Sequence, residues 1–469
     1  MDRKVNVREL QARLARHAEI ALLDTREQGV HYRGHPFYAS SAPLSKLEMM
    51  IADLVPRRSA PIVVFDGGEG LADKAAHKLR ELGYTSVQTL EGGTAAWKAA
   101  GGELFGGINV PSKAFGEFVE HRYETPRITG AELERLKKIG KDVLILDSRP
   151  FEEYQRMCIP GGIDAPGAEL AYRVHDLVRD PHTLIVVNCA GRTRSIIGCQ
   201  SLRNAGVENP VVALKDGTMG WELAGYQSEK GAARRAGDPS AQGLAKAQAA
   251  AEQVAQRFGV KFADAGTVHR WLADGGRTTC LLDVRTREEF EAGHIAGSRH
   301  APGGQLVQAT DEYVGVRHAR LVLVDPQRVR AIMTASWLAQ MGWHDVYVLA
   351  SLAGFHVESG ARQAPLLGFR EWPTVKEPSG TVLDFSTSLR FHYQHIPGAW
   401  WVVRSRLPEA KEKLGERKAL TLTSEDGVLA HLAAAEVQAL WPGAQVHVLE
   451  GGNAAWRGQW EEGHEHSTT

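Results

Sequence analysis

Short apolar runs alternate with longer helical patterns along the whole chain. The runs are rich in Val, Ile and Leu, as at residues 20–24 and 183–187, which is typical of buried strands. The helical patterns, such as 71–84, 329–343 and 429–441, place apolar residues three and four positions apart. Strands that alternate with helices predict an α/β fold, in which a parallel sheet carries helices on both faces.

Three signatures recur four times in the same order. The first is a strand that ends in an aspartate: Asp24, Asp147, Asp283 and Asp384. The second is a later apolar strand. The third is a strand and a turn of small residues before an aromatic: Trp97, Trp221, Phe355 and Trp456. The aspartates are 123, 136 and 101 residues apart and the aromatics 124, 134 and 101. These spacings are too long for solenoid repeats of about 20–50 residues and predict whole domains.

We therefore expect four domains, which we call units one to four: residues 1–108, 109–230, 231–366 and 367–469. A 32-residue segment at 228–259, rich in Ala, Gln, Gly and charge, is typical of a flexible linker that runs into a helix. The connections between units one and two and between units three and four are shorter. We expect each of those two couples to pack as a pair, with the Ala-rich segment joining the pairs.

Composition excludes several classes of protein. The 469 residues carry a net charge of -1, which gives no general attraction to nucleic acid or to an anionic membrane. The start of the chain lacks the apolar core of a signal peptide, and no apolar run is long enough to span a membrane. Four cysteines without CxxC spacing are too few for a disulfide scaffold, so a cytoplasmic protein is expected.

Cys189 lies where chemistry is expected in such a fold. It follows the apolar strand at 183–187 and precedes a helical pattern at 195–206, so it belongs to a loop between a strand end and a helix start. Ligands of parallel sheets bind at this edge, where backbone N–H groups and the helix dipole favour an anion. Such surroundings favour the reactive thiolate, whereas the alternative is a buried structural cysteine.

The residues around Cys189 have functional and structural interpretations. Arg192 and Arg194 could bind an anionic donor or be surface charges, and Gly191 would let the loop curl. Arg149 and Arg173 could face the same cleft or form salt bridges, and Asp147 is expected to anchor the loops by hydrogen bonds. Three further thiols are expected to be core residues, although the first could be a resolving thiol: Cys158, Cys199 and Cys280.

The repeated motifs resemble those of the rhodanese family of thiosulfate and mercaptopyruvate sulfurtransferases. Unit three has "DVRTREEFEAGHIAGSRHAPGG", close to the family's D-x-R, acidic helix and G-H-I-P-G-A. Unit four keeps "HIPGAW", unit one keeps "RGH", and unit two has Cys158 where the histidine is usual. The resemblance covers nearly the whole chain and implies four tandem rhodanese-like domains.

The resemblance implies that the loop cysteine carries sulfur as a persulfide, and only Cys189 matches that position. Asp66, Asp325 and Ser424 stand in the other three units, which are therefore expected to be catalytically silent. The substrate would be held by the rest of the loop, Ala190, Gly191, Arg192, Thr193 and Arg194. The expected partners are a small sulfur donor and a thiol or cyanide acceptor, with neither metal nor other cofactor.

Two other functions fit parts of the pattern. Cysteine phosphatases use C-x5-R, but Cys189 and Arg194 form a C-x4-R loop, whose shorter ring of N–H groups suits sulfur better than phosphate. A sulfur-relay or scaffold protein would explain three silent units and would hand the persulfide sulfur to a protein acceptor. The intact loop at Cys189 argues against a pure scaffold, whereas a relay would use the same persulfide.

Overall fold

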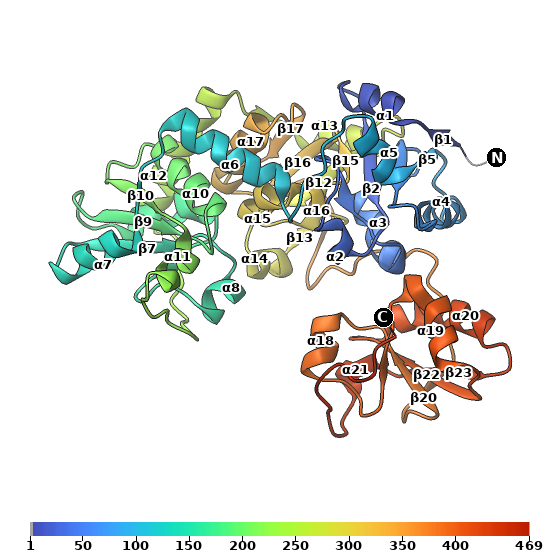
Figure 1. The fold of residues 1–469 in the computed structure, drawn as a ribbon. Coiled ribbons are helices and arrows are strands. Elements are labelled where there is room, and N and C mark those ends of the chain that lie inside the picture. The colour runs from blue at the N-terminus through green and yellow to red at the C-terminus, as the bar shows by residue number, and fades with distance from the viewer. Residues whose placement is uncertain (1–2, 469) are drawn as a thin grey trace.

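The computed structural model describes residues 3–468 and contains four α/β units in sequence (Figure 1). Each unit has a central sheet of mainly parallel strands flanked by helices, which confirms the predicted fold class. The first unit has the sheet order β1-β5-β4-β2, with β3 beside β2. Its elements are β1 (Lys4–Val5), α1 (Val7–Leu14), β2 (Ile20–Asp24), α2 (Gln28–His31), β3 (Ser40–Ser41), η1 (Leu44–Lys46), α3 (Leu47–Leu54), β4 (Ile62–Phe65), α4 (Leu71–Glu81), β5 (Val87–Leu90) and α5 (Gly93–Ala99).

Unit two repeats this order as β6-β10-β9-β7-β8, and every pairing in it is parallel. Its central strand β9 is buried along its whole length, as its apolar sequence predicts. The elements are α6 (Val110–Tyr123), β6 (Arg127–Ile128), α7 (Gly130–Lys138), β7 (Val143–Asp147), α8 (Phe151–Arg156), β8 (Ile163–Asp164), α9 (Glu169–Leu177), β9 (Leu184–Asn188), α10 (Thr193–Asn204), β10 (Val211–Leu214) and α11 (Gly217–Leu223).

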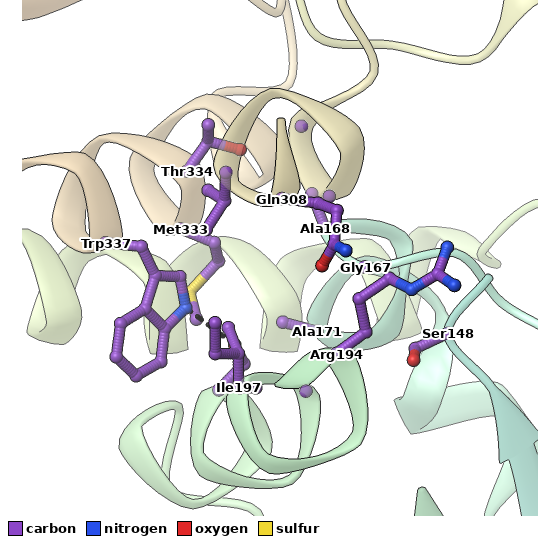
Figure 2. A pocket seen from close by; sticks show the side chains of 15 residues that line it. Ser148, Gly167, Ala168, Ala171, Arg194, Ile197, Gln308, Met333, Thr334 and Trp337 are labelled. Carbon is purple, nitrogen blue, oxygen red and sulfur yellow. Dashed lines mark hydrogen bonds between the residues drawn. The ribbon is translucent and has the colours of Figure 1, made fainter. Parts of the chain in front are cut away.

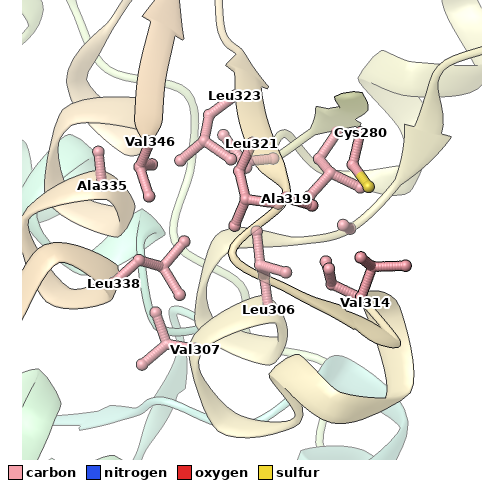
Figure 3. Packing of buried hydrophobic residues seen from close by; sticks show 14 of the residues in the cluster. Cys280, Leu306, Val307, Val314, Ala319, Leu321, Leu323, Ala335, Leu338 and Val346 are labelled. Atoms are coloured by element: carbon pink, nitrogen blue, oxygen red, sulfur yellow. The ribbon is translucent and has the colours of Figure 1, made fainter. Parts of the chain in front are cut away.

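Unit three has the order β11-β17-β16-β12-β14, and it lends β15 to the sheet of unit one, where β15 pairs antiparallel with β2. In its core, Leu321 and Leu323 of β16 face Leu338 and Leu306 of two covering helices (Figure 3). Its elements are α12 (Ala241–Phe258), β11 (Lys261–Phe262), α13 (Ala265–Ala273), β12 (Thr279–Asp283), α14 (Arg287–Ala292), β13 (His294–Ile295), β14 (Arg299–His300), α15 (Gly303–Gln308), α16 (Thr310–Tyr313), β15 (Val316–Arg317), β16 (Arg320–Val324), α17 (Val329–Gln340), β17 (Val346–Leu349) and β18 (Val357–Glu358).

Unit four has the order β19-β23-β22-β20-β21 and its own hydrophobic core around Trp441. In Figure 1 it lies below the other three units. Its elements are β19 (Thr374–Val375), β20 (Thr381–Asp384), α18 (Ser388–Tyr393), β21 (Trp400–Trp401), η2 (Arg404–Arg406), α19 (Leu407–Leu414), β22 (Ala419–Thr423), α20 (Val428–Leu440), β23 (Gln445–Leu449) and α21 (Gly452–Ala455).

The Ala-rich segment runs into a helix, α12, as its composition predicted, but its first part is not a flexible linker. Residues 229–238 form the edge of unit two, where the backbone of Cys158 bridges Glu229 and that of Asp164 bridges Arg235. The helix α12 then packs between α9 and α17 and buries one face through small side chains, including Ala247 and Ala251. Alanines four residues apart lie on one face of α12 and let the neighbouring helices approach closely. Composition alone does not reveal this spacing.

The expected pairing of the units is also wrong. Unit two packs on unit three through α9, α10, α12, α15 and α17, and unit one meets unit four through η1 and η2. One hydrophobic core runs through units one to three and includes Leu47, Phe115, Ile196 and Trp337. Short connections did not decide which units pack together, because the apolar helix faces of units two and three cover each other.

Candidate active site

Cys189 lies at the carboxyl end of β9, in a loop that ends where α10 begins at Thr193. Its side chain is almost fully buried, with 2% of the residue exposed. The helix that follows has 12 residues, so its first N–H groups carry the positive end of a substantial helix dipole. Sequence and structure therefore place this thiol in the same local setting.

The closing turn of unit two supports the back of this loop. The backbone N–H of Thr218 donates to the carbonyl of Cys189 at 2.8 Å, and that of Met219 donates to the carbonyl of Ala190 at 3.0 Å. Gly217 makes the approach possible, because its φ is +55° and a Cβ there would lie 2.2 Å from the Cys189 carbonyl oxygen. Gly191 has no left-handed φ and open space around it, so it is not the glycine that shapes the loop.

Asp147 ties three segments together beneath the loop. Its carboxylate accepts hydrogen bonds from Arg149 at 2.9 and 2.7 Å and from Asn188 Nδ2 at 3.0 Å. Asn188 also donates to Thr218 Oγ1, which links the strand before Cys189 to the closing turn. Arg149 also donates from Nη2 to the carbonyl of Met157, so this buried guanidinium is held by the protein on two sides.

Arg194 is paired with a carboxylate that the sequence did not single out. Its guanidinium donates two hydrogen bonds of 2.8 Å to Glu153 of α8. Burial opposes ionisation of Glu153, but the Arg194 charge outweighs it and lowers the pKa of Glu153. One nitrogen of Arg194 also lies 3.4 Å from Oε1 of Gln305, a residue of unit three. Unit three thus contributes a side chain beside the loop.

Arg192 and Arg173 point to other acidic partners. Arg192 forms ion pairs with Glu117 and Glu120 of α6, the helix that connects units one and two. Arg173 is buried and contacts Glu169, Asp238 and the carbonyl of Ala236, which favours its structural interpretation. Each of the four arginines predicted near Cys189 is therefore held by at least one carboxylate.

The other three units fill the same loop with their own side chains. The Asp66 carboxylate accepts the N–H groups of Gly68 and Ala72 at 2.9 and 3.0 Å. The Ser424 hydroxyl accepts the N–H of Ala430 at 3.3 Å. Counting the loop from Asp66 or Ser424 as position one, the first residue accepts the N–H of the seventh in both units. In unit one it also accepts the N–H of the third.

Unit three repeats this arrangement with one more donor. The Asp325 carboxylate accepts the N–H groups of Gln327, Arg330 and Ala331, the third, sixth and seventh loop positions. The corresponding N–H groups in unit two belong to Gly191, Arg194 and Ser195. We call these three groups the cradle.

The other three cysteines are buried and free. Cys158 occupies the position of the stacked histidines of the other units, and its backbone bridges Glu229 as His294 bridges Glu358 and His395 bridges Glu461. Burial raises the pKa of Cys158 and raises the pKa of Cys199 and Cys280 to about 12. Cys280 lies within the core of unit three in Figure 3.

Units two and three meet through equivalent surfaces beside the loop. A Cβ on Gly167 would lie 2.3 Å from the Gly304 Cα, so the two backbones touch where the two A-P-G turns meet. Figure 2 shows the small pocket at this boundary, with Arg194 and Ser148 at one end and Trp337 at the other. Its volume of about 30 Å³ suits one or two water molecules and not a sulfur donor.

Polar side chains of each unit contact the other unit across this interface. Arg330 of unit three, the counterpart of Arg194, is fully buried and pairs with Glu289, the counterpart of Glu153. It also lies 3.2 Å from Glu169 of unit two. In the matching contact, Gln305 of unit three lies beside Arg194 of unit two. Each unit therefore contributes a side chain that contacts the loop arginine of the other.

Sequence reasoning missed a set of residues at the site: Glu117, Glu120, Glu153, Gly217 and Gln305. Glu153 had a signal, because the third unit repeats an acidic pair at the same place in its motif. The two α6 carboxylates had none, since their partner lies 75 and 72 residues away in sequence. No group of three or more His, Cys, Asp or Glu suited to a metal, and no helix suited to crossing a membrane, occurs within residues 3–468.

Comparisons with known proteins agree with the fourfold pattern. The model of the rhodanese-like domain matches residues 6–100, 129–224, 264–351 and 371–459. The crystal structure of thiosulfate sulfurtransferase from Pseudomonas aeruginosa is 49% identical, with a TM-score of 0.95, covering 99% of this chain and 91% of that one. The HTH-type transcriptional regulator Rv0324 from Mycobacterium tuberculosis is 42% identical over 113 residues, which are 24% of this chain and 48% of the regulator.

The chain therefore belongs to the rhodanese family, as its motifs predicted. It is a sulfurtransferase enzyme built from four tandem rhodanese-like domains.

Proposed function

We propose that this enzyme moves a sulfane sulfur from a small donor to a thiophilic acceptor through a persulfide on Cys189. Thiosulfate, a persulfide or 3-mercaptopyruvate would be the donor, and a thiol or cyanide the acceptor. One observation carries the proposal: all four units retain the same loop, but only unit two begins it with a thiol. The others begin it with Asp66, Asp325 or Ser424, none of which can carry a sulfane sulfur.

The first half-reaction forms the persulfide. With thiosulfate, the Cys189 thiolate attacks the outer sulfur, a new S–S bond forms, and the old S–S bond breaks with its electron pair leaving on sulfite. The products are the Cys189 persulfide anion and sulfite, so charge and sulfur balance. This is nucleophilic catalysis by a thiolate, with the leaving group departing as an anion.

The cradle would hold the charge that develops on the persulfide. The N–H groups of Gly191, Arg194 and Ser195 correspond to those that bind the Asp325 carboxylate in unit three. The silent unit thus contains its own anion in the equivalent place, as a stand-in for the charged outer sulfur. N–H groups fixed in this way stabilise charge without reorganising during the reaction.

The second half-reaction returns the thiolate. An acceptor such as cyanide attacks the outer sulfur, the persulfide S–S bond breaks, and its electron pair returns to Cys189 as thiocyanate leaves. Donor and acceptor are used in separate steps, so ping-pong kinetics are expected. Arg194 would keep the loop in place through Glu153, and Gln305 of unit three would support Arg194 from the other side.

Intact-mass analysis of the whole chain after incubation with each donor tests the proposal. A gain of one sulfur on the wild-type protein, and none on Cys189→Ser, is the expected result. Serine is nearly isosteric but cannot carry the sulfane sulfur, so Cys189→Ser should lose at least about a thousandfold in turnover, a loss typical of a removed nucleophile. Most of the turnover remaining in Cys189→Ser would refute the assignment.

The buried cysteines supply matched controls for this experiment. Cys158→Ser, Cys199→Ala and Cys280→Ala should each keep persulfide formation, because their thiols lie in apolar packing away from the cradle. Loss of the sulfur in Cys158→Ser would assign that thiol a part in the reaction. Aryl phosphate, offered to the same samples, should not be hydrolysed.

A further inference from the structure

Arg149, Arg192 and Arg194, the three arginines beside the Cys189 loop, provide no net positive charge together with their partners. Arg149 is paired with Asp147, Arg194 with Glu153, and Arg192 with both Glu117 and Glu120. Glu120 is shared with Arg127 at 2.7 Å, so the Arg192 cluster of two arginines and two glutamates is neutral. The positive field that remains uncompensated comes from the backbone N–H groups of the cradle and the start of α10.

Arg192 is the guanidinium of this set that solvent reaches most. Its side chain is 37% exposed, whereas those of Arg194 and Arg149 are 14% and 4% exposed. A donor that approaches from solution therefore meets the charge of Arg192 together with that of Glu117, whose side chain is half exposed. The other two ion pairs lie deeper and are fixed by bidentate hydrogen bonds.

The helix α6 holds its carboxylates in a defined position against the loop. It packs along α10, and a Cβ on Gly116 would lie 3.0 Å from Cγ2 of Thr193, so the helix touches the loop directly. Both ends of α6 are fastened to unit three. Ser112 Oγ donates to the Gln308 carbonyl, and Tyr123 donates to Gln340, both at 2.6 Å.

We propose that Glu117 and Glu120 set the charge preference of the Cys189 cleft. By cancelling the charge of Arg192 they would reduce the advantage that a dianionic donor has over a monoanionic one. This inference rests on the proposed sulfur transfer through Cys189 and adds how the cleft discriminates donors by charge. It assigns a specificity role to a connecting helix that lies outside the repeated motif.

Two donors that react in the same way but differ in charge isolate the effect of donor charge on the rate. Thiosulfate, a dianion, gives the persulfide anion and sulfite. Methanethiosulfonate, a monoanion, gives the same persulfide anion and methanesulfinate. In each case the thiolate of Cys189 forms one S–S bond, one sulfur–sulfur bond of the donor breaks, and the electron pair leaves with the oxidised sulfur. The ratio of kcat/KM for the two donors therefore reports how the cleft responds to one additional negative charge.

The test measures this ratio in the full-length double variant Glu117→Gln/Glu120→Gln. Two unit charges about 10 Å apart in water change an equilibrium about twofold, so removing two carboxylates should raise kcat/KM about fourfold per donor charge. The thiosulfate to methanethiosulfonate ratio should rise about fourfold at low ionic strength. The rise should vanish near 1 M salt, where the screening length is about 3 Å.

Matched variants keep the inference falsifiable. Glu208→Gln removes an exposed carboxylate beyond the far end of α10 and should leave the ratio unchanged. Arg192→Gln leaves Glu117 uncompensated, while Glu120 keeps Arg127, and should lower the ratio. If the double variant folds poorly, the half-exposed Glu117→Gln alone should raise the ratio about twofold.

An unchanged ratio in a folded, active Glu117→Gln variant would overturn the inference while leaving the Cys189 assignment intact. Failure of the sulfur-transfer proposal is distinguishable, because it would appear as transfer that survives Cys189→Ser.

Discussion

At the scale of single residues, pairing rather than residue type decides what each charged group does. Arg149, Arg173, Arg192 and Arg194 all follow the pattern expected of anion-binding residues, yet each contacts a carboxylate. A guanidinium held bidentately by a carboxylate is a positioning group as much as a cation. The anion site that remains is a set of backbone N–H groups, for which the side chains supply geometry.

Asp164 is a residue whose ionisation opposes the fold. It is buried at the end of β8, and one of its carboxylate oxygens has no hydrogen-bond partner. Burial, together with the nearby charge of Asp147, raises the pKa of Asp164 from 3.8 to about 8. This carboxyl is therefore protonated in the folded protein at neutral pH.

We expect Asp164→Asn to change how stability depends on pH. Because the folded pKa of Asp164 lies above its unfolded value, its contribution to stability is complete below pH 4 and is lost as pH rises toward 8. The variant should gain at least about 1.4 kcal/mol over wild type between pH 5 and pH 8, the value of one pKa unit. Urea unfolding at pH 5 and pH 8 measures the free energy of unfolding of both proteins. An equal change between the two pH values in wild type and variant would contradict the prediction.

At the scale of elements, the contact between the Cys189 loop and α11 fixes the site. The loop carbonyls of Cys189 and Ala190 accept N–H groups from the first turn of α11. Gly93 in unit one and Gly452 in unit four make the same close approach to Asp66 and Ser424. The small-residue turn before the aromatic therefore packs directly against the loop. This close contact explains why small residues recur in that signature.

Two glycines on either side of this contact should respond differently to alanine. Gly217→Ala would place a Cβ 2.2 Å from the Cys189 carbonyl oxygen at a left-handed φ, so the loop must shift. We expect at least a tenfold fall in turnover, since strain of this kind costs about 1–3 kcal/mol.

Gly191→Ala is the matched control, because its Cβ would meet nothing within 4 Å and its φ is not left-handed. It keeps the N–H of the cradle and should stay within about twofold of wild type, as relaxed glycine replacements usually do. Steady-state rates with thiosulfate and cyanide test both variants. Equal losses in the two would mean that α11 does not seat the loop.

At the scale of the whole molecule, two buried ionic contacts join units that the short connections had not paired, units two and three and units one and four. Units two and three share a buried ionic contact through Arg330, and units one and four share one through Arg404. Arg330 contacts Asp325, Glu289 and Glu169, and Arg404 contacts Glu48 and Glu436. Only the first couple borders the Cys189 loop, through Gln305 and Arg194.

Breaking the two contacts separately should separate stability from activity. Arg330→Met leaves the buried Asp325 without an ion-pair partner, and Arg404→Met leaves the buried Glu48 with Lys78 alone. Breaking a buried ion pair typically costs about 3–5 kcal/mol. Both variants should lower the thermal midpoint of the intact chain. We expect Arg330→Met alone to lower thiocyanate production, by at least about fivefold, while Arg404→Met stays within about twofold. A comparable loss of activity in Arg404→Met would show that unit four influences the cleft.

The sequence by itself determined the features that arise from contiguous segments. The fourfold repeat, the α/β units and the position of Cys189 between β9 and α10 all follow from apolar periodicity and from a strand, loop and helix that adjoin in the chain. The filled loops of units one and three follow as well, because Asp66 and Asp325 bind N–H groups only two to six residues away. Local bonding of this kind needs no knowledge of the remaining fold.

Only the tertiary structure decided which units meet and what the arginines contact. Arg192 reaches Glu117 across 75 residues, and Arg194 reaches Gln305 across 111 residues. Such contacts depend on how α6 and α15 dock, and docking is set by whole apolar faces that many arrangements of four similar units could bury. Sequence periodicity states that a face is apolar but not which other face will cover it.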